Sequence, residues 1–279
     1  MTTGNTLLRR LAKKLLGPIR STPFYSQIQA MSMARDIKSG RFHEPELVLL
    51  PTAVKPGETV LDIGANFGLY SYHLSRAVGP NGRVIGFEPV PFTNQTLGRV
   101  VSRLGLKNVE IHPVGVGDKP GTLTFTVPLQ SSGQLMAGQA HIGTRNDNHG
   151  DIKGQVRWEK TTQIDCPVVV LDDELKGLQS LSFLKIDIEG AEVFAFRGAM
   201  GLIRQFHPTV LIEINPWFLD GFQLTMNDLT GPFRDLGYKV YRYDPKRKKL
   251  DHVADESTIV EYNYFFIHPD YLGRFSELL

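Results

Sequence analysis

The sequence of 279 residues predicts an α/β fold of the Rossmann-like kind, with a mostly parallel sheet and helices on both faces. From Thr59 onward, short β-rich runs alternate with helical stretches, which is the pattern of βαβ units. A glycine-rich turn, Asp62 to Gly68, joins the first β-rich run to the first helix, as at the ligand-binding end of such sheets. Hydrophobic residues make up 41% and charged residues 22% of the chain, a composition typical of a globular protein.

The first three strands follow at regular intervals. The first strand is expected at 59–63 and is followed by a helix at 69–78. The second strand, 83–88, precedes a helix that Thr93 or Asn94 is expected to cap. A third strand covers 109–114.

The middle of the chain departs from this regular alternation. An additional strand at 122–127 is predicted to lie at the sheet edge or in an added hairpin. Residues 128–162 are polar, irregular and long for a connection, so we interpret them as an insertion. This insertion is either a lid on the substrate side or a surface loop without a specific role. Strand character returns at 168–170.

Two further βα units and a hairpin complete the predicted fold. The strands at 181–188 and 209–214 are each followed by one predicted helix. The runs 238–243 and 262–268 are separated by charged, turn-rich residues and are predicted to pair as a C-terminal hairpin. We therefore expect residues 51–279 to form the Rossmann-like domain.

Residues 1–50 are predicted to be an N-terminal helical extension. Leucines and basic residues between 7 and 16 could form a basic amphipathic helix. This helix either packs on the domain or makes peripheral contact with a membrane surface. No stretch approaches the roughly 20 consecutive apolar residues that a membrane-spanning helix needs.

Charge and cysteine content restrict the partners and the compartment. The 31 basic and 29 acidic side chains give a net charge of +2, which does not predict nucleic-acid binding. The only cysteine, Cys166, excludes an intramolecular disulfide and a zinc site of paired cysteines. We therefore expect a cytoplasmic protein.

The turn from Asp62 to Gly68 has the chemistry of a ligand-binding loop. Gly64 lets the backbone approach a ligand, and Gly68 allows close packing where the helix begins. The carboxylate of Asp62 suits a ligand ammonium better than a pyrophosphate. Ala65 and Asn66 stand where the dinucleotide motif G-x-G-x-x-G has its second glycine. This difference argues against a nicotinamide-dependent oxidoreductase, which is the alternative from another reaction class.

Two acidic residues follow the next strands. Glu88 ends the second strand, where an acidic side chain in such folds accepts hydrogen bonds from both ribose hydroxyls. Asp118 follows the third strand and is placed to accept a hydrogen bond from an adenine amino group. The alternative for Asp118 is an ordinary turn residue before Lys119 and Pro120.

Four motifs in the chain resemble those of the FkbM family of S-adenosylmethionine-dependent methyltransferases. In order they read VLDIGANFG at 60–68, GFEP at 86–89, VGD at 116–118 and, most specifically, LKIDIEGAE at 184–192. The resemblance implies a class I methyltransferase sheet of seven strands with a reversed last strand. It also implies that S-adenosylmethionine binds across the first two βα units. The expected reaction is O-methylation of a sugar or a natural-product-like small molecule, glycosides included.

The resemblance also implies a set of cofactor-binding residues. Glu44 precedes the first motif and is expected to contact the methionine part of the cofactor. The whole set consists of Glu44, Asp62, Gly64, Asn66, Phe67, Gly68, Glu88, Pro89 and Asp118. A subunit that binds the cofactor without catalysing methyl transfer remains an alternative.

Three charged residues are the catalytic candidates. Lys185, Asp187 and Glu189 are predicted to share one face of the strand at 181–188. Burying such side chains is costly unless they pair, so Lys185 with Asp187 or Glu213 could be a purely structural ion pair. In the other interpretation, Asp187 or Glu189 orients or deprotonates the acceptor hydroxyl beside the expected sulfonium methyl group.

Three residues are candidates for substrate binding. Glu213 ends the next strand, and together with Asp187 and Glu189 it could hold Mg²⁺, although a site without metal is the favoured interpretation. Trp217 could form an aromatic wall for a sugar or ring substrate, or could pack in the core. His141 lies in the insertion and could reach a substrate or remain solvated.

Overall fold

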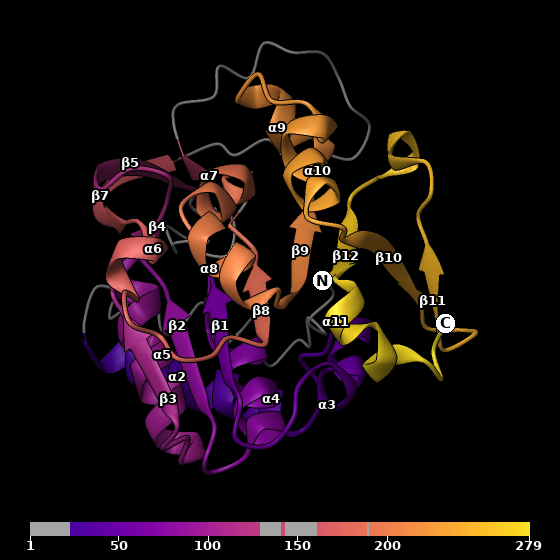
Figure 1. Ribbon diagram of the computed structural model, residues 1–279. Coiled ribbons are helices and arrows are strands. Elements are labelled where there is room, and N and C mark those ends of the chain that lie inside the picture. Colours follow the sequence, from indigo (N-terminus) through magenta and orange to yellow (C-terminus); the bar gives the residue numbers. More distant parts are fainter. Residues whose placement is uncertain (1–22, 129–140, 143–160, 189) are drawn as a thin grey trace.

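The computed structural model describes residues 23–128, 141–142, 161–188 and 190–279, and its centre is an eight-stranded sheet (Figure 1). The strand order across this sheet is β11-β10-β12-β9-β8-β1-β2-β3. Its strands are β1 (Thr59–Ile63), β2 (Arg83–Phe87), β3 (Val109–His112), β8 (Phe183–Ile186), β9 (Thr209–Ile214), β10 (Lys239–Asp244), β11 (Lys249–His252) and β12 (Tyr262–Ile267).

The strand directions confirm the predicted class I methyltransferase fold. The strands β3, β2, β1, β8 and β9 pair in parallel. The last strand, β12, is antiparallel to both of its neighbours, β9 and β10, so it is the reversed strand. The runs predicted as a C-terminal hairpin, β10 and β12, do pair antiparallel, but β11 lies between them in the chain, so the hairpin itself is β10 with β11. The edge strand β11, which pairs with β10, is an eighth strand that was not predicted.

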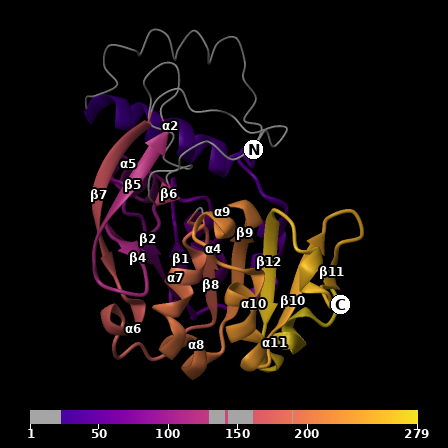
Figure 2. The same cartoon turned by 90° about the horizontal axis from the view of Figure 1, so that it is seen from above.

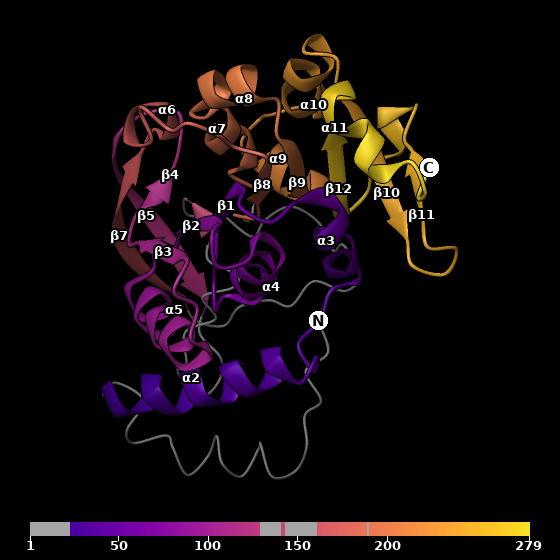
Figure 3. The ribbon, with the colours of Figure 1, turned by 60° about the horizontal axis from the view of Figure 1, so that its bottom comes forward.

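Helices cover both faces of the sheet, as predicted (Figure 3). One face packs against α7 (Glu192–Arg197), α8 (Met200–Phe206) and α10 (Met226–Asp235), and its core includes Leu184 and Ile186. The opposite face packs against α3 (Leu50–Ala53), α4 (Leu69–Val78) and α5 (Pro91–Leu104), and its core includes Phe183. Successive residues of β8 thus alternate between the two cores, as the pleat of a strand requires.

A second, four-stranded sheet lies beside β2 and β3, with the order β4-β7-β5-β6 (Figures 2 and 3). Its strands are β4 (Gly115–Val116), β5 (Gly121–Pro128), β6 (His141–Ile142) and β7 (Thr161–Val169). The strand predicted at 122–127 is therefore correct, but it does not join the edge of the main sheet. The prediction that order returns only at 168–170 was wrong, because β7 pairs along β5 from Thr161 onward. Most of the predicted insertion at 128–162 lies outside the described residues.

Two helix predictions were also wrong. Helix α5 begins at Pro91 after the N-cap Val90, rather than at a cap provided by Thr93 or Asn94, because proline is favoured in the first helical turn. The helix expected after β8 is divided into α7 and α8. Helix α7 ends at Gly198, where the backbone packs closely on Gly117. A Cβ atom on Gly198 would lie 2.0 Å from the Gly117 carbonyl oxygen.

The helix expected after β9 is likewise divided, into α9 (Pro216–Gly221) and α10. Thr225 caps α10 through a reciprocal capping box with Asp228, which starts a new helix at this point. Helix α9 consequently stands over the carboxyl ends of the strands (Figure 1).

The N-terminal part of the described chain joins the same core as the sheet. Helix α2 (Pro23–Lys38) runs across α5, and Ala30 and Ile37 are buried with Val60 of β1 in one cluster (Figure 3). The amphipathic segment predicted between 7 and 16 lies outside the described residues. Within the described part of the chain, no helix combines the length and apolar character needed to cross a membrane.

Candidate functional site

The glycine turn after β1 leaves no room for a side chain. Gly64 has φ +79°, and a Cβ atom on it would lie 1.9 Å from the carbonyl oxygen of Asp187. The Gly64 and Ala65 amides both donate to the carbonyl oxygen of Phe87, at 3.0 Å. The turn is thus fixed against the ends of β2 and β8. Only glycine meets these requirements at position 64.

Glu88 stands at the end of β2 with its carboxylate turned back toward this turn. One oxygen accepts from the Asn66 amide at 3.0 Å, and the other accepts from the Val90 amide at 2.9 Å. The side chain is buried, and burial raises the pKa of Glu88 to about 7 despite these two hydrogen bonds. A carboxylate held in this way can accept further hydrogen bonds from a neighbouring diol.

Asn66 lies in the left-handed region, with φ +48°. Its side-chain oxygen Oδ1 is buried and has no hydrogen-bond partner within the described structure. Buried polar atoms are normally paired, so this oxygen is suited to accept from a bound ligand. Phe67 is half-buried beside it, and Gly68, with φ +89°, begins α4 against Leu97.

Asp62 lies at the end of β1 and points toward α4. Its carboxylate accepts from the Ser71 hydroxyl at 2.5 Å, and it is 1% exposed. Burial raises the pKa of Asp62 to about 6. The parallel pairing of β1 with β8 puts Lys185 directly beside Asp62.

Lys185 is a fully buried ammonium in a polar cluster. Its Nζ lies 3.4 Å from Asp187 Oδ2 and donates to Asn263 Oδ1 at 3.2 Å. It also lies 4.9 Å from the centre of the Tyr70 ring. Burial alone would lower the pKa of Lys185, but the nearby carboxylates of Asp187 and Glu213 outweigh burial and raise it. Lys185 therefore carries a positive charge at neutral pH.

Asp187 is the ionised partner of this lysine. Burial alone would raise the pKa of Asp187, but Lys185 and a hydrogen bond with Glu213 together hold it below its ordinary value. Its side chain is 24% exposed, so part of it is accessible to a ligand. The predicted pairing of Lys185, Asp187 and Glu213 is thus present in the structure. In the described residues, Asp187 and Glu213 belong to no group of three side chains able to hold a metal ion.

Glu44 reaches the same cluster from the N-terminal side. The Tyr70 hydroxyl donates to Glu44 Oε2 at 2.7 Å, and Asn263 Nδ2 lies 3.5 Å from the same oxygen. Burial, with Glu44 next to it, raises the pKa of Tyr70 far above its usual range, so this hydroxyl remains protonated. Sequence reasoning missed Tyr70 and Asn263, although Tyr70 lies only six residues beyond Gly64.

Glu192 organises the loop that follows β8. Its Oε1 accepts from the Gly190 amide at 2.9 Å and from the Ile188 amide at 3.3 Å. Burial raises the pKa of Glu192 to about 7. Glu192 is the last residue of the motif at 184–192, and the sequence predicted no role for this residue. Through these two hydrogen bonds, Glu192 holds the backbone of the loop that follows Asp187.

Helix α9 packs directly on this loop. A Cβ atom on Gly190, which has φ +96°, would lie 2.4 Å from the Phe218 Cβ atom. Trp217, next to it, is half-buried, and its ring meets that of Phe218 edge to face at 5.1 Å. The structure therefore places Trp217 above the carboxyl ends of β8 and β9, near the predicted acceptor side.

A small apolar pocket adjoins the glycine turn. Its walls include Gly64, Pro89, Val114, Phe125 and Ile188. Pro89 therefore lies next to Gly64, as the predicted site requires. Such walls suit the flat face of a base.

Asp118 is not brought to this pocket. It is exposed in the connection between β4 and β5, where the neighbouring Gly117 packs on Gly198. His141 pairs with Thr126 through the backbone of β6, and Glu189 lies outside the described residues.

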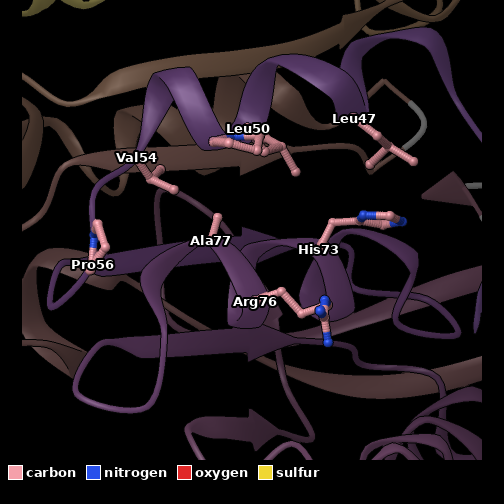
Figure 4. Close-up of a pocket in the computed structure, with 8 residues that line it drawn as sticks. Leu47, Leu50, Val54, Pro56, His73, Arg76 and Ala77 are labelled. Carbon is pink, nitrogen blue, oxygen red and sulfur yellow. The ribbon is translucent and has the colours of Figure 1, made fainter.

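A larger groove, of about 370 Å³, lies between α3 and α4 (Figure 4). Apolar residues such as Leu50, Val54 and Ala77 line it, with His73 and Arg76 on the α4 side. None of the predicted site residues lines this groove. The convergence of charged and polar groups is instead at the carboxyl ends of β1, β2 and β8.

Comparison with known proteins decides the family. A family model described as the methyltransferase FkbM domain matches residues 62–240, well over half of the chain. The chain belongs to the FkbM methyltransferase family. The matched range contains the glycine turn, Glu88 and the Lys185–Asp187 pair of this FkbM domain.

Individual relatives differ in how much of their length this FkbM chain spans. It is 28% identical over 146 residues to "Methyltransferase 1" of Beauveria bassiana (strain ARSEF 2860), covering 50% of this chain and 57% of the relative. It is 30% identical over 264 residues to the "AMB antimetabolite synthetase AmbE" of Pseudomonas aeruginosa, covering 83% of this chain but 11% of that protein. The chain thus spans little more than half the length of the first of these relatives.

A solved structure shares the family name. The crystal structure of "Methyltransferase FkbM" from Methylobacillus flagellatus KT is 18% identical, and the match covers 93% of this chain and 59% of that chain with a TM-score of 0.46.

Proposed function

We propose that this FkbM-family chain is an S-adenosylmethionine-dependent O-methyltransferase acting on a hydroxyl of a sugar or natural-product-like small molecule. The observation that carries the proposal is the arrangement of Asp62, Gly64 and Glu88. Two buried carboxylates end adjacent parallel strands on either side of a turn that admits no Cβ atom. This arrangement matches a ligand with both an ammonium and a ribose diol.

The residues near the turn fit each part of this cofactor. Glu88 would accept from the ribose hydroxyls, and the unpaired oxygen of Asn66 offers a further acceptor. Asp62 and Glu44 provide negative charge for the methionine ammonium. The apolar walls at Pro89 and Ile188 would lie against one face of the adenine ring. Asp118 is exposed between β4 and β5, and its contact with the adenine amino group stays a prediction.

When bound, S-adenosylmethionine supplies an electrophilic methyl group. The chain's own contribution is to hold the acceptor hydroxyl in line and to receive its proton. Asp187 suits this role because it is ionised and partly exposed at the carboxyl end of β8. Lys185 keeps Asp187 ionised, and Glu192 holds the loop after Asp187 by accepting from the Gly190 amide. Glu189 remains a second predicted candidate for the same role.

The acceptor side is proposed from α9 and the strand ends. Trp217 provides an aromatic surface above β8 and β9, which suits the apolar face of a sugar or ring. Glu213, hydrogen-bonded to Asp187, would orient further hydroxyls, and His141 of β6 remains a predicted contact. Similarity to part of an antimetabolite synthetase supports a natural-product-like acceptor.

Calorimetric titration tests the cofactor assignment. We expect S-adenosylhomocysteine to bind with micromolar affinity and NADH not to bind, each with and without Mg²⁺. Binding of NADH alone would support the oxidoreductase alternative and contradict the proposal. A requirement for Mg²⁺ would contradict the interpretation of a site without metal.

Methyl transfer to a panel of hydroxyl acceptors tests the reaction. Asp187→Asn is expected to lower turnover at least 100-fold while S-adenosylhomocysteine affinity changes less than threefold. The control Asp173→Asn alters an exposed carboxylate of α6 (Leu171–Glu174) and should leave both values unchanged. Cofactor binding without turnover on any acceptor would favour a non-catalytic subunit.

A further inference from the structure

Two histidines and an aspartate come together where β9 begins and β12 ends, at the end of these strands opposite to the candidate site. His207 follows α8, and His268 follows β12 and caps α11 (Pro269–Leu272). The two helices lie at the same end of the molecule (Figures 2 and 3). Val210 of β9 pairs with Phe266 of β12, and continuing this antiparallel register puts His268 opposite Pro208. The two histidines are therefore neighbours through the sheet.

The potential ligand atoms converge on one point. His207 Nδ1 lies 2.8 Å and His268 Nδ1 lies 3.1 Å from the same oxygen, Asp270 Oδ2. One ligand atom from each of the three residues lies within 4.8 Å of the others. An ion about 2.0–2.2 Å from nitrogen and oxygen donors fits a triangle of this size after small side-chain movements.

The two imidazole rings stack with centroids 3.9 Å apart and planes at 24°, so one ring must turn about its side-chain bonds to place an ion in the plane of both. The Tyr238 ring packs on His268 at 5.2 Å, and its hydroxyl donates to the Pro208 carbonyl oxygen at 2.9 Å. His207 has φ +48°, a conformation that at helix ends is usually taken by glycine or asparagine.

His268 Nδ1 is close to two groups of Asp270. It accepts from the Asp270 amide at 3.2 Å and lies 3.1 Å from the carboxylate oxygen Oδ2. A cation between this nitrogen and this oxygen would be attracted to both.

We propose that His207, His268 and Asp270 bind a Zn²⁺ ion or a similar divalent transition metal. Two imidazoles and one carboxylate are ligands that suit zinc, nickel or copper, whereas Mg²⁺ and Ca²⁺ prefer oxygen alone. Asp270 is 58% exposed on its side chain, so an ion can enter from solvent and complete its coordination with water.

This metal site is separate from the methyl-transfer site. The six residues of β9 separate the two ends of this strand by ~20 Å, at about 3.3 Å per residue. The ion would join the start of β9 to the end of β12, segments that are distant in sequence. It is therefore expected to stabilise the C-terminal part of the sheet without taking part in catalysis.

The test is a titration of tag-free, chelator-treated full-length protein with Zn²⁺ alone. One equivalent is expected to bind with a Kd in the micromolar range or below. At a 100-fold excess of free Zn²⁺ over Kd, the thermal midpoint should rise by ~5 °C or more. Co²⁺ substitution should give visible absorption bands that Zn²⁺ abolishes.

Variants distinguish this site from adventitious binding. His268→Ala and His207→Asn, which keeps a residue tolerant of the left-handed conformation, should each weaken Zn²⁺ binding at least 50-fold. The control His252→Ala alters a single exposed histidine and should bind as the wild type does. If the histidine variants do not fold by circular dichroism, Asp270→Asn provides the same test. Absence of one-to-one binding in the wild type, or full retention in these ligand variants, would overturn the proposal.

Discussion

The carbonyl oxygen of Asp187 lies 1.9 Å from the position that a Cβ atom on Gly64 would occupy. The turn that would carry the cofactor and the loop that would carry the catalytic carboxylate are therefore in direct backbone contact. Both loops continue directly from strands that pair with each other, β1 and β8, which holds them at this distance.

We predict that Gly64→Ala destabilises the protein by about 3 kcal/mol and abolishes S-adenosylhomocysteine binding. The new methyl group collides with backbone, and alanine is also strained at φ +79°. Urea unfolding measures the first effect, and calorimetry measures the second.

Gly57 provides a matched control for this substitution. It has φ +89°, but a Cβ atom there has nothing within 4 Å. Gly57→Ala should therefore show only the conformational cost, about 1 kcal/mol, with cofactor affinity unchanged. Equal destabilisation by the two substitutions would show that the close contact with Asp187 adds nothing to the destabilisation.

The buried carboxyl group of Glu192 should make stability depend on pH. Its pKa is raised from 4.5 to about 7, so the folded protein binds more protons than the unfolded chain between these values. Its contribution to stability is fully present below pH 4.5 and is lost as the pH rises through 7. The loss is about 3 kcal/mol at most.

The substitution Glu192→Gln isolates this contribution. Glutamine keeps a carbonyl oxygen for the Gly190 and Ile188 amides but has no proton to lose. Between pH 5 and pH 8, the free energy of unfolding of the variant should fall less steeply than that of the wild type. Parallel pH profiles for the two proteins, measured by urea unfolding, would contradict the role of Glu192.

Single and double substitutions at Lys185 and Asp187 should change the free energy of unfolding by very different amounts. Lys185→Met leaves an ionised carboxylate without its partner, and we expect a loss of about 2–4 kcal/mol. Adding Asp187→Asn removes the unpaired charge and should restore part of this loss. Urea unfolding of the four proteins in the cycle gives the coupling energy.

The exposed pair Arg197 and Asp228 is a control, because it has the same separation as the Lys185–Asp187 pair but lies in solvent. Its nitrogen and oxygen are also 3.4 Å apart, but both side chains are well exposed to solvent. Arg197→Met should leave stability almost unchanged, because water screens such pairs. A similar loss at both sites would mean that burial does not strengthen the Lys185–Asp187 interaction.

The sequence predicted those parts of the site that depend on local order. Gly64, Asp62 and Glu88 lie at the ends of strands that hydrophobic runs define, so their meeting follows from parallel pairing alone. The ion pair of Lys185 with Asp187 followed in the same way from residue alternation along one strand.

Contacts between distant segments could not be predicted. Asn263 meets Glu44 across 219 residues, and no local pattern indicates that β12 returns beside the N-terminal segment. The division between α7 and α8 depends on the backbone of Gly117, which belongs to a second sheet. Helix periodicity at 192–206 contains no information about that neighbour.

The last prediction concerns the pH dependence of cofactor binding. Burial raises the pKa of Glu88 to about 7, while a ribose diol binds best to the ionised carboxylate. The affinity for S-adenosylhomocysteine should therefore fall about tenfold between pH 8 and pH 6, as Glu88 takes up a proton. Asp62, whose pKa is raised to about 6, should add to the loss at the acid end of this range.

Glu88→Gln should bind more than tenfold more weakly at pH 8 and should lose most of this pH dependence. The control Glu110→Gln alters an exposed carboxylate on β3, next to β2, and should titrate like the wild type. Calorimetry at pH 6, 7 and 8 measures all three proteins. If the wild-type affinity is constant over this range and Glu88→Gln binds equally well, Glu88 does not hold the ribose, and the cofactor must bind through other residues of the turn.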